Sequence, residues 1–176
     1  GRHLIQLTRL PRVFPMNAYF VREDDGLTLI DTGMAGGAPG ILQAAEQLSA
    51  PITRIVLTHA HMDHVGSLDA LHAALPQAEV LISERDARFL RGEMSLDAAE
   101  RSMQLRGSYL TAKTPPTRLL RDGDSVGSLR VIATPGHTPG HIALFDPREG
   151  DVIAGDAFQT QGGLAVSGVL RWRFPF

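Results

Sequence analysis

Apolar and polar positions form two kinds of pattern along this chain, and each kind predicts a different element. Short alternating or continuous apolar runs bounded by turn residues are typical of strands, whereas apolar residues three and four apart are typical of helices. Strands are predicted at residues 3–9, 17–22, 27–30, 55–57, 79–82, 118–120, 129–133, 142–145 and 152–154. Helices are predicted at residues 39–49 and 68–75. The alternating order indicates an α/β fold.

The stretch from 83 to 116 has a different pattern, rich in charges and closed by Lys113-Thr114-Pro115-Pro116. It predicts two further helices, near residues 84–91 and 95–110. We interpret 83–116 either as a helical insertion near the active site or as a solvated face.

Composition narrows the class of protein. The 176 residues fit a single domain spanning 1–176, and 43% hydrophobic with 20% charged residues is a globular balance. A formal net charge of −2 provides no positive field for a polyanion, so we expect no nucleic-acid partner. The chain has no cysteine, so any metal must be held by His, Asp and Glu.

The lengths of the apolar runs bear on whether the protein is associated with a membrane and on its cellular compartment. All of them are strand-sized, far below the roughly 20 residues needed to span a bilayer, so we expect no membrane partner. The first residues lack the apolar stretch of a signal peptide, which favours the cytoplasm. Because the chain does not begin with Met, export stays open.

A cluster of metal-ligand types follows the strand predicted at 55–57. Residues 58–64 read Thr-His-Ala-His-Met-Asp-His, which places His59, His61, Asp63 and His64 at the start of the next helix. Residues two apart on an extended backbone point to the same side, so His59 and His61 can converge on one ion. Asp63 and His64 lie where the chain turns, and this suggests a second, adjacent metal. Ordinary surface histidines with an Asp helix cap are the alternative.

Two other strand ends carry ligand types. The loop 134–141, Thr-Pro-Gly-His-Thr-Pro-Gly-His, presents His137 after one strand, and Asp156 follows another strand in Ala154-Gly155-Asp156. Open α/β sheets bind their ligands at the carboxyl ends of strands. The three segments therefore point to one site.

These motifs resemble those of the metallo-β-lactamase-fold hydrolases, and in particular the glyoxalase II and lactonase branch. The resemblance runs along nearly the whole chain. It includes Leu29-Ile30-Asp31-Thr32-Gly33, the 59–64 cluster, Asp122-Gly123-Asp124, Thr134 to His137 and Gly155-Asp156. It implies an α/β (α+β) fold, a four-layer αβ/βα sandwich of two mixed sheets packed face to face, with helices outside and a dinuclear site along one edge.

The resemblance also implies a role for each residue. His59, His61 and His137 would bind one metal, Asp63 and His64 a second, and Asp156 would bridge the two. Asp63 would also move a proton in catalysis. Asp31 would orient an imidazole from behind the ligands or, as the alternative, cap the following turn. Such members supply a further His well beyond the bridging Asp, and none follows Asp156 here, so we expect the C-terminal portion to be lacking.

The leading hypothesis is a zinc-dependent hydrolase that uses a metal-bridging hydroxide to cleave a small ester, lactone or thioester. We expect two zinc ions per chain in the complete protein, with iron or manganese as alternatives, and a small-molecule substrate. The oligomeric state is open, with a dimer as one alternative. The competing hypotheses are a mononuclear-iron persulfide dioxygenase and a non-catalytic metal-binding relative.

Overall fold

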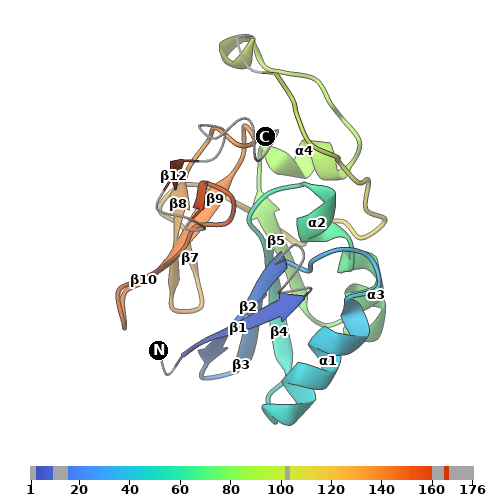
Figure 1. The fold of residues 1–176 in the computed structure, drawn as a ribbon, viewed down its shortest axis with the longest axis vertical. Helices are drawn as coiled ribbons and strands as arrows, with labels where there is room; N and C mark the ends of the chain where they lie inside the picture. The colour runs from blue at the N-terminus through green and yellow to red at the C-terminus, as the bar shows by residue number, and fades with distance from the viewer. Residues whose placement is uncertain (1–2, 10–15, 102–103, 160–164, 167–176) are drawn as a thin grey trace.

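The first of two β-sheets lies at the centre of the molecule and comes from the N-terminal part of the chain (Figure 1). The computed structural model describes residues 3–9, 16–101, 104–159 and 165–166. The strands are ordered β1-β2-β3-β4-β5-β6; the first two pairings are antiparallel and the other three are parallel. Their bounds are β1 Leu4–Arg9, β2 Met16–Glu23, β3 Gly26–Ile30, β4 Ile52–Leu57, β5 Glu79–Ser83 and β6 Arg118–Leu120.

The second sheet has the order β10-β9-β8-β7, and every pairing in it is antiparallel. Its strands are β7 Ser125–Val126, β8 Leu129–Ala133, β9 Ile142–Asp146 and β10 Asp151–Ile153. A separate short pair joins β11 Phe158–Gln159 to β12 Ala165–Val166. In Figure 1 the second sheet stands beside the first, on the side away from α1 and α3.

The helices cover the other face of the first sheet. They are α1 Ala38–Gln47, α2 Met62–Val65, α3 Leu68–Ala74 and α4 Asp86–Leu90, with a 3-10 turn η1 at Ala98–Glu100. In α1 the buried residues Ala38, Ile41 and Ala45 recur at spacings of three and four, which places them on the face toward the sheet. Pro39 at the helix start fixes a helical φ where no intrahelical N–H bond is lost.

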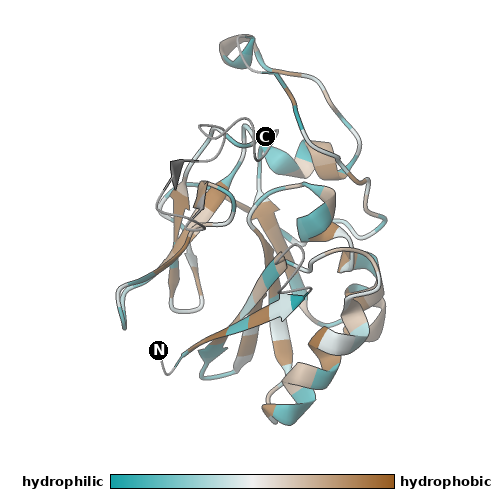
Figure 2. Ribbon diagram, viewed as in Figure 1, coloured by the Kyte–Doolittle hydropathy of each residue, from teal (hydrophilic) through white to brown (hydrophobic). Residues whose placement is uncertain are grey.

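Two apolar cores hold these layers together. One lies between the first sheet and the helices and includes Phe20, Leu57 and Leu71; the other lies between the sheets, where Val56 of β4 and Leu144 of β9 belong to one cluster. Because β3, β4 and β5 are covered on both faces, they carry buried apolar runs such as Ile55-Val56-Leu57 and Val80-Leu81-Ile82. Brown segments mark apolar residues in this part of the sheet in Figure 2.

The predicted architecture is confirmed in its main features. Two sheets pack against each other, and the helices lie outside the first sheet. The second sheet differs from the expected mixed pattern, since its described pairings are all antiparallel. Three layers are present in the described part of the chain, where no helix covers the outer face of the second sheet.

The prediction of a helix near residues 95–110 is wrong. Among the described residues of this segment only η1 is helical, and the rest of them run as an arm that projects from the body (top of Figure 1). Its backbone is used by the rest of the protein: the Met62 N–H donates to the Ser108 carbonyl, and His61 bonds the Arg106 carbonyl. A helix would consume these carbonyls internally. The first helix of the stretch is present as the shorter α4.

Candidate metal centre

Three strand ends meet at the edge where the two sheets come together. His59 and His61 lie in the loop after β4, His137 lies in the loop after β8, and Asp156 follows β10. The Ile142 N–H at the start of β9 donates to the Thr58 carbonyl over 3.0 Å, which joins the two sheets at this point. The site residues therefore come together only when the sheets are packed.

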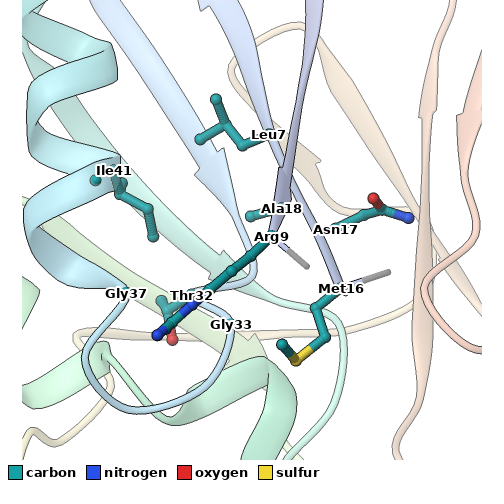
Figure 3. A pocket seen from close by; sticks show the side chains of 10 residues that line it. Leu7, Arg9, Met16, Asn17, Ala18, Thr32, Gly33, Gly37 and Ile41 are labelled. Atoms are coloured by element: carbon teal, nitrogen blue, oxygen red, sulfur yellow. The ribbon is translucent and has the colours of Figure 1, made fainter. Parts of the chain in front are cut away.

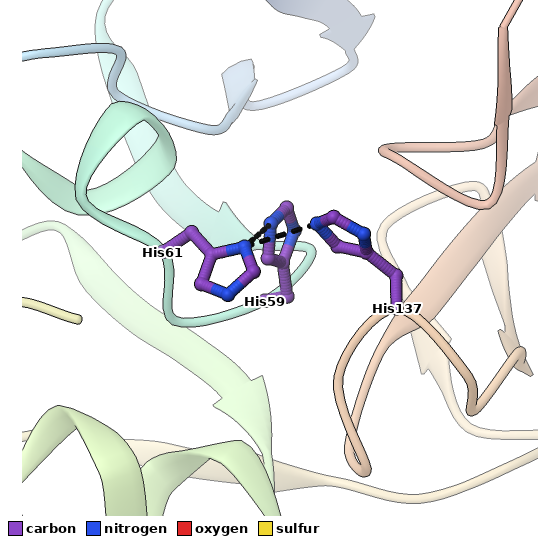
Figure 4. Close-up of side chains that lie close together, drawn as sticks. All are labelled: His59, His61 and His137. Atoms are coloured by element: carbon purple, nitrogen blue, oxygen red, sulfur yellow. Dashed lines mark hydrogen bonds between the residues drawn. The ribbon is translucent and has the colours of Figure 1, made fainter. Parts of the chain in front are cut away.

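The first candidate ligand group is a triad of histidines, His59, His61 and His137. His61 Nδ1 lies 3.1 Å from His59 Nε2 and 3.0 Å from His137 Nε2, as the dashed lines of Figure 4 indicate. The rings of His59 and His61 are nearly perpendicular, at 83°. Three ring nitrogens thus converge on one point.

In two of these rings, the nitrogen that faces away from the centre makes a hydrogen bond. This bond determines which nitrogen carries the proton and which is bare, that is, unprotonated with a free lone pair. His61 Nε2 lies 2.8 Å from the Arg106 carbonyl, which only accepts, so Nε2 carries the proton and Nδ1 is bare. His59 Nδ1 lies 3.0 Å from the Thr58 hydroxyl, whose own proton goes to Asp31 Oδ2 at 2.8 Å. His59 therefore donates at Nδ1 and is bare at Nε2. Two lone pairs then face each other at 3.1 Å, an arrangement that a cation between them stabilises.

A second candidate group comprises His59, His64 and Asp156. His64 Nε2 lies 3.4 Å from Asp156 Oδ1, while Asp156 Oδ2 lies 3.3 Å from His137 Nε2. The two oxygens of Asp156 thus face the two groups, which is the placement a bridging carboxylate needs. Because His59 Nδ1 faces Thr58, only its Nε2 faces the centre, so the two groups share one donor atom.

Asp31 holds this arrangement from behind. Its carboxylate accepts from the Thr58 N–H, the Thr58 hydroxyl and His64 Nδ1, each over 2.8 Å, and it is 2% exposed. These contacts leave His64 Nε2 facing Asp156. Asp31 has φ 61°, a left-handed conformation that few residues other than Gly and Asn adopt readily.

Burial and mutual repulsion keep the triad in its metal-binding form. Burial and the neighbouring imidazoles lower the pKa of His59 and His137, and they lower the pKa of His61 to about 4. His64 differs: burial acts against its charge, but Asp31 and Asp156 hold its pKa well above the ordinary value. Burial likewise opposes ionisation of Asp156, yet the contact with His64 holds the pKa of that carboxyl well below its usual range.

The remaining predicted residue, Asp63, lies beside these groups. Its Oδ2 is 3.8 Å from His64 Nε2, its side chain is 35% exposed, and it joins neither group in the described part of the chain. Asp63 therefore lies beside His64, partly exposed, without joining either group.

Two groups hold site residues in place without being ligands themselves, and sequence reasoning did not assign this role to either. One is the Arg106 carbonyl, which no side-chain pattern could indicate. The other is His141, whose Nε2 accepts from the Asp156 N–H over 3.0 Å while its Nδ1 lies 2.7 Å from the Thr134 hydroxyl. The repeated Thr-Pro-Gly-His of the 134–141 loop was the available signal.

A separate open pocket of about 130 Å³ lies between β1, β2 and the start of α1 (Figure 3). Leu7, Ala18 and Ile41 contribute apolar walls, and Arg9 and Thr32 contribute polar ones. None of its lining residues belongs to either candidate ligand group. The pocket is therefore distinct from the histidine site.

The chain belongs to the metallo-β-lactamase superfamily. The sequence model described as "Metallo-beta-lactamase superfamily" matches residues 11–172. Relatives from Bacillus subtilis (strain 168) include the uncharacterized protein YobT, 50% identical over 97% of this chain and 74% of its own, and the probable metallo-hydrolase YqgX, 33% identical over 88% and 71%.

Two further comparisons bear on the site. A hydroxyacylglutathione hydrolase of Cereibacter sphaeroides (strain ATCC 17023) is 34% identical over 83% of this chain and 49% of its own. The crystal structure of TTHA1623 in a di-iron-bound form matches 94% of this chain and 78% of that chain, with TM-score 0.67 and 31% identity. The predicted family, and the class of metal-dependent hydrolase, are confirmed. No helix in the described residues combines the length and the apolar character that a membrane crossing requires.

Proposed function

We propose that this protein hydrolyses a small ester, lactone or thioester with one or two divalent cations, zinc first among them. The observation that carries the proposal is the convergence of three ring nitrogens, with the bare nitrogens of His59 and His61 facing each other at 3.1 Å. Imidazole nitrogens are ligands that zinc and iron both accept. The relative named hydroxyacylglutathione hydrolase supports an acyl compound as the substrate class.

In this proposal each residue has a defined task. His59, His61 and His137 would hold the first cation, His64 and Asp63 would hold the second, and Asp156 would contribute to both. A bound divalent cation would polarise a substrate carbonyl and lower the pKa of a water molecule. Asp31 and Thr58 keep His59 and His64 oriented. Asp63, partly exposed beside His64, would take a proton from the attacking water and pass it to the leaving group.

Metal analysis and a substrate panel test the proposal. We expect bound zinc in the purified protein and turnover of at least one member of a panel of lactones, thioesters and β-lactams. Asp63→Asn should lower kcat and leave the metal content of the histidine triad unchanged, because Asp63 is not one of the triad ligands. Asp24→Asn, in the exposed turn after β2, is the matched control and should leave both unchanged.

Two results would contradict the hydrolase proposal. Equal inactivity of the wild type and Asp63→Asn on every substrate, with normal metal binding, would favour a non-catalytic relative. A single iron per chain with thiol-dependent oxygen uptake would favour a persulfide dioxygenase. That second candidate has support in the histidine triad, since three imidazoles can hold a single ion, and in the iron of the TTHA1623 structure, although that structure, in its di-iron-bound form, holds two ions.

A further inference from the structure

A buried carboxylate outside the predicted site joins the two loops that carry the histidine triad. Asp86, the first residue of α4, is 0% exposed. Its Oδ2 accepts from the Ala60 N–H over 3.0 Å and from the Thr138 hydroxyl over 2.7 Å, and its Oδ1 accepts from the Gly140 N–H over 2.8 Å. Ala60 stands between His59 and His61, and Thr138 directly follows His137.

We propose that Asp86 is the positioning residue of the first metal site, and that it sets the separation between the His59–His61 loop and the His137 loop. This inference rests on the proposed function in taking the three histidines as ligands of one ion. Asp86 contacts the peptide between two of those ligands and the residue next to the third. A shift of either loop would move His61 Nδ1 away from His137 Nε2, which now lie 3.0 Å apart.

The packing around Asp86 leaves little room for such a shift. A Cβ at Gly140 would lie 2.5 Å from both the nitrogen and Oδ1 of Asp86, and 2.6 Å from Ser83 Oγ, so only glycine allows this approach. Ser83, at the end of β5, accepts from the Asp86 N–H over 3.1 Å. Asp86 is thus fixed to the first sheet through its backbone N–H and to the 134–141 loop through its carboxylate.

The chemistry of the contacts requires a carboxylate. All three partners donate, two of them from backbone N–H groups that cannot reverse. In Asp86→Asn, the amide N–H₂ must face either the Gly140 N–H or the Ala60 N–H and the Thr138 hydroxyl. At least one donor then loses its acceptor in a buried place, where this loss is most costly.

The test measures metal affinity of the full chain by competition with a chelator, using zinc, and records the visible spectrum of the cobalt(II)-substituted protein. Changes to residues that orient metal ligands lower affinity by about 10–100-fold, and we expect this loss in Asp86→Asn. Thr138→Val should weaken zinc binding by a smaller factor, and Thr138→Ser, which keeps the hydroxyl, should restore it.

Asp69→Asn is the matched control. Asp69 is also a helical Asp whose carboxylate accepts backbone N–H groups, those of Lys113 and Thr114 at 2.8–3.1 Å, but it joins α3 to a loop without triad residues. We expect it to lower thermal stability while leaving zinc affinity and the cobalt spectrum unchanged. A purely structural role for Asp86 predicts the same behaviour in both variants.

The outcomes separate the two proposals. Zinc affinity and a cobalt spectrum in Asp86→Asn equal to those of the wild type would overturn the positioning role and leave the hydrolase proposal standing. Equal zinc affinity in Thr138→Val and Thr138→Ser would also count against it. Weakened zinc binding in Asp86→Asn, in a protein that turns over no substrate, would support the positioning role and refute the hydrolase. A wild type that binds no divalent cation would overturn both.

Discussion

Asp31→Asn tests whether one carboxylate orients both groups of the metal centre. Asparagine has nearly the shape of aspartate and tolerates the φ of 61° at this position, so the backbone need not change. The substitution alters only the charge and one of the two acceptor oxygens. Its effect should therefore report the three hydrogen bonds that Asp31 accepts from Thr58 and His64.

The size of the effect follows from the number of donors. The amide N–H₂ must face either the Thr58 N–H or the pair formed by the Thr58 hydroxyl and His64 Nδ1. At least one charge-assisted bond is lost, a destabilisation of about 1.5–3 kcal/mol. For a domain of this size, that corresponds to a decrease in Tm of roughly 3–12 °C.

In the neutral His64 ring, which its raised pKa confines to high pH or to the metal-bound protein, the change should also reverse the tautomer. If the amide donates to Nδ1, the ring carries its proton on Nε2, the atom that faces Asp156 at 3.4 Å, and offers no lone pair to a cation there. Calorimetry of the metal-free protein, nitrogen NMR of the imidazoles and metal analysis are the assays. Asp25→Asn, which removes an exposed pairing with Arg54, controls for loss of charge and should cost about 0–1 kcal/mol. An unchanged Tm together with an unchanged His64 tautomer would refute the reasoning.

Three further predictions concern the same centre. Removal of metal with a chelator should lower Tm, since an ion at 100 times its Kd adds about 2.7 kcal/mol to stability; equal calorimetric traces would contradict a bound ion. Gly107→Ala would place a Cβ 2.7 Å from His61 Nε2 and should weaken zinc binding about 10-fold in chelator competition, whereas Gly123→Ala, at a similar φ with nothing within 4 Å, should not. Burial lowers the pKa of His141 to about 3, so the unfolded chain takes up this proton first, and stability of the metal-free protein should fall between pH 6.5 and 3. In His141→Gln, the free energy of unfolding measured in urea should decrease less steeply as the pH falls. Identical pH dependence in the variant and the wild type would contradict this prediction.

Most of the scaffold could be predicted because its signals are local. The buried strands β3, β4 and β5 contain short apolar runs bounded by polar residues, and α1 shows its buried positions at helical spacing. The ligand types also follow strand ends directly in the sequence, so their gathering at one edge followed from the fold class.

The failures have one physical cause, which is that long-range contacts override local preference. The residues around Tyr109 could form a helix, but the backbone there bonds His61 and Met62 instead. Asp86 lies 26 residues from Ala60 and 52 from Thr138, so no spacing rule connects them. The two-residue strand β7 is too short to leave a periodic pattern.

The histidine triad has a consequence for folding, because its members come from both sheets and His61 and His137 are 76 residues apart. An ion held by all three would be a reversible cross-link that closes a loop of this length. By the loop-entropy relation used for disulfides, such a closure restricts the open chain by about 4 kcal/mol while the ion stays bound. The chain has no cysteine for a permanent cross-link, so a bound metal would add a reversible one to the apolar core that already joins the two sheets.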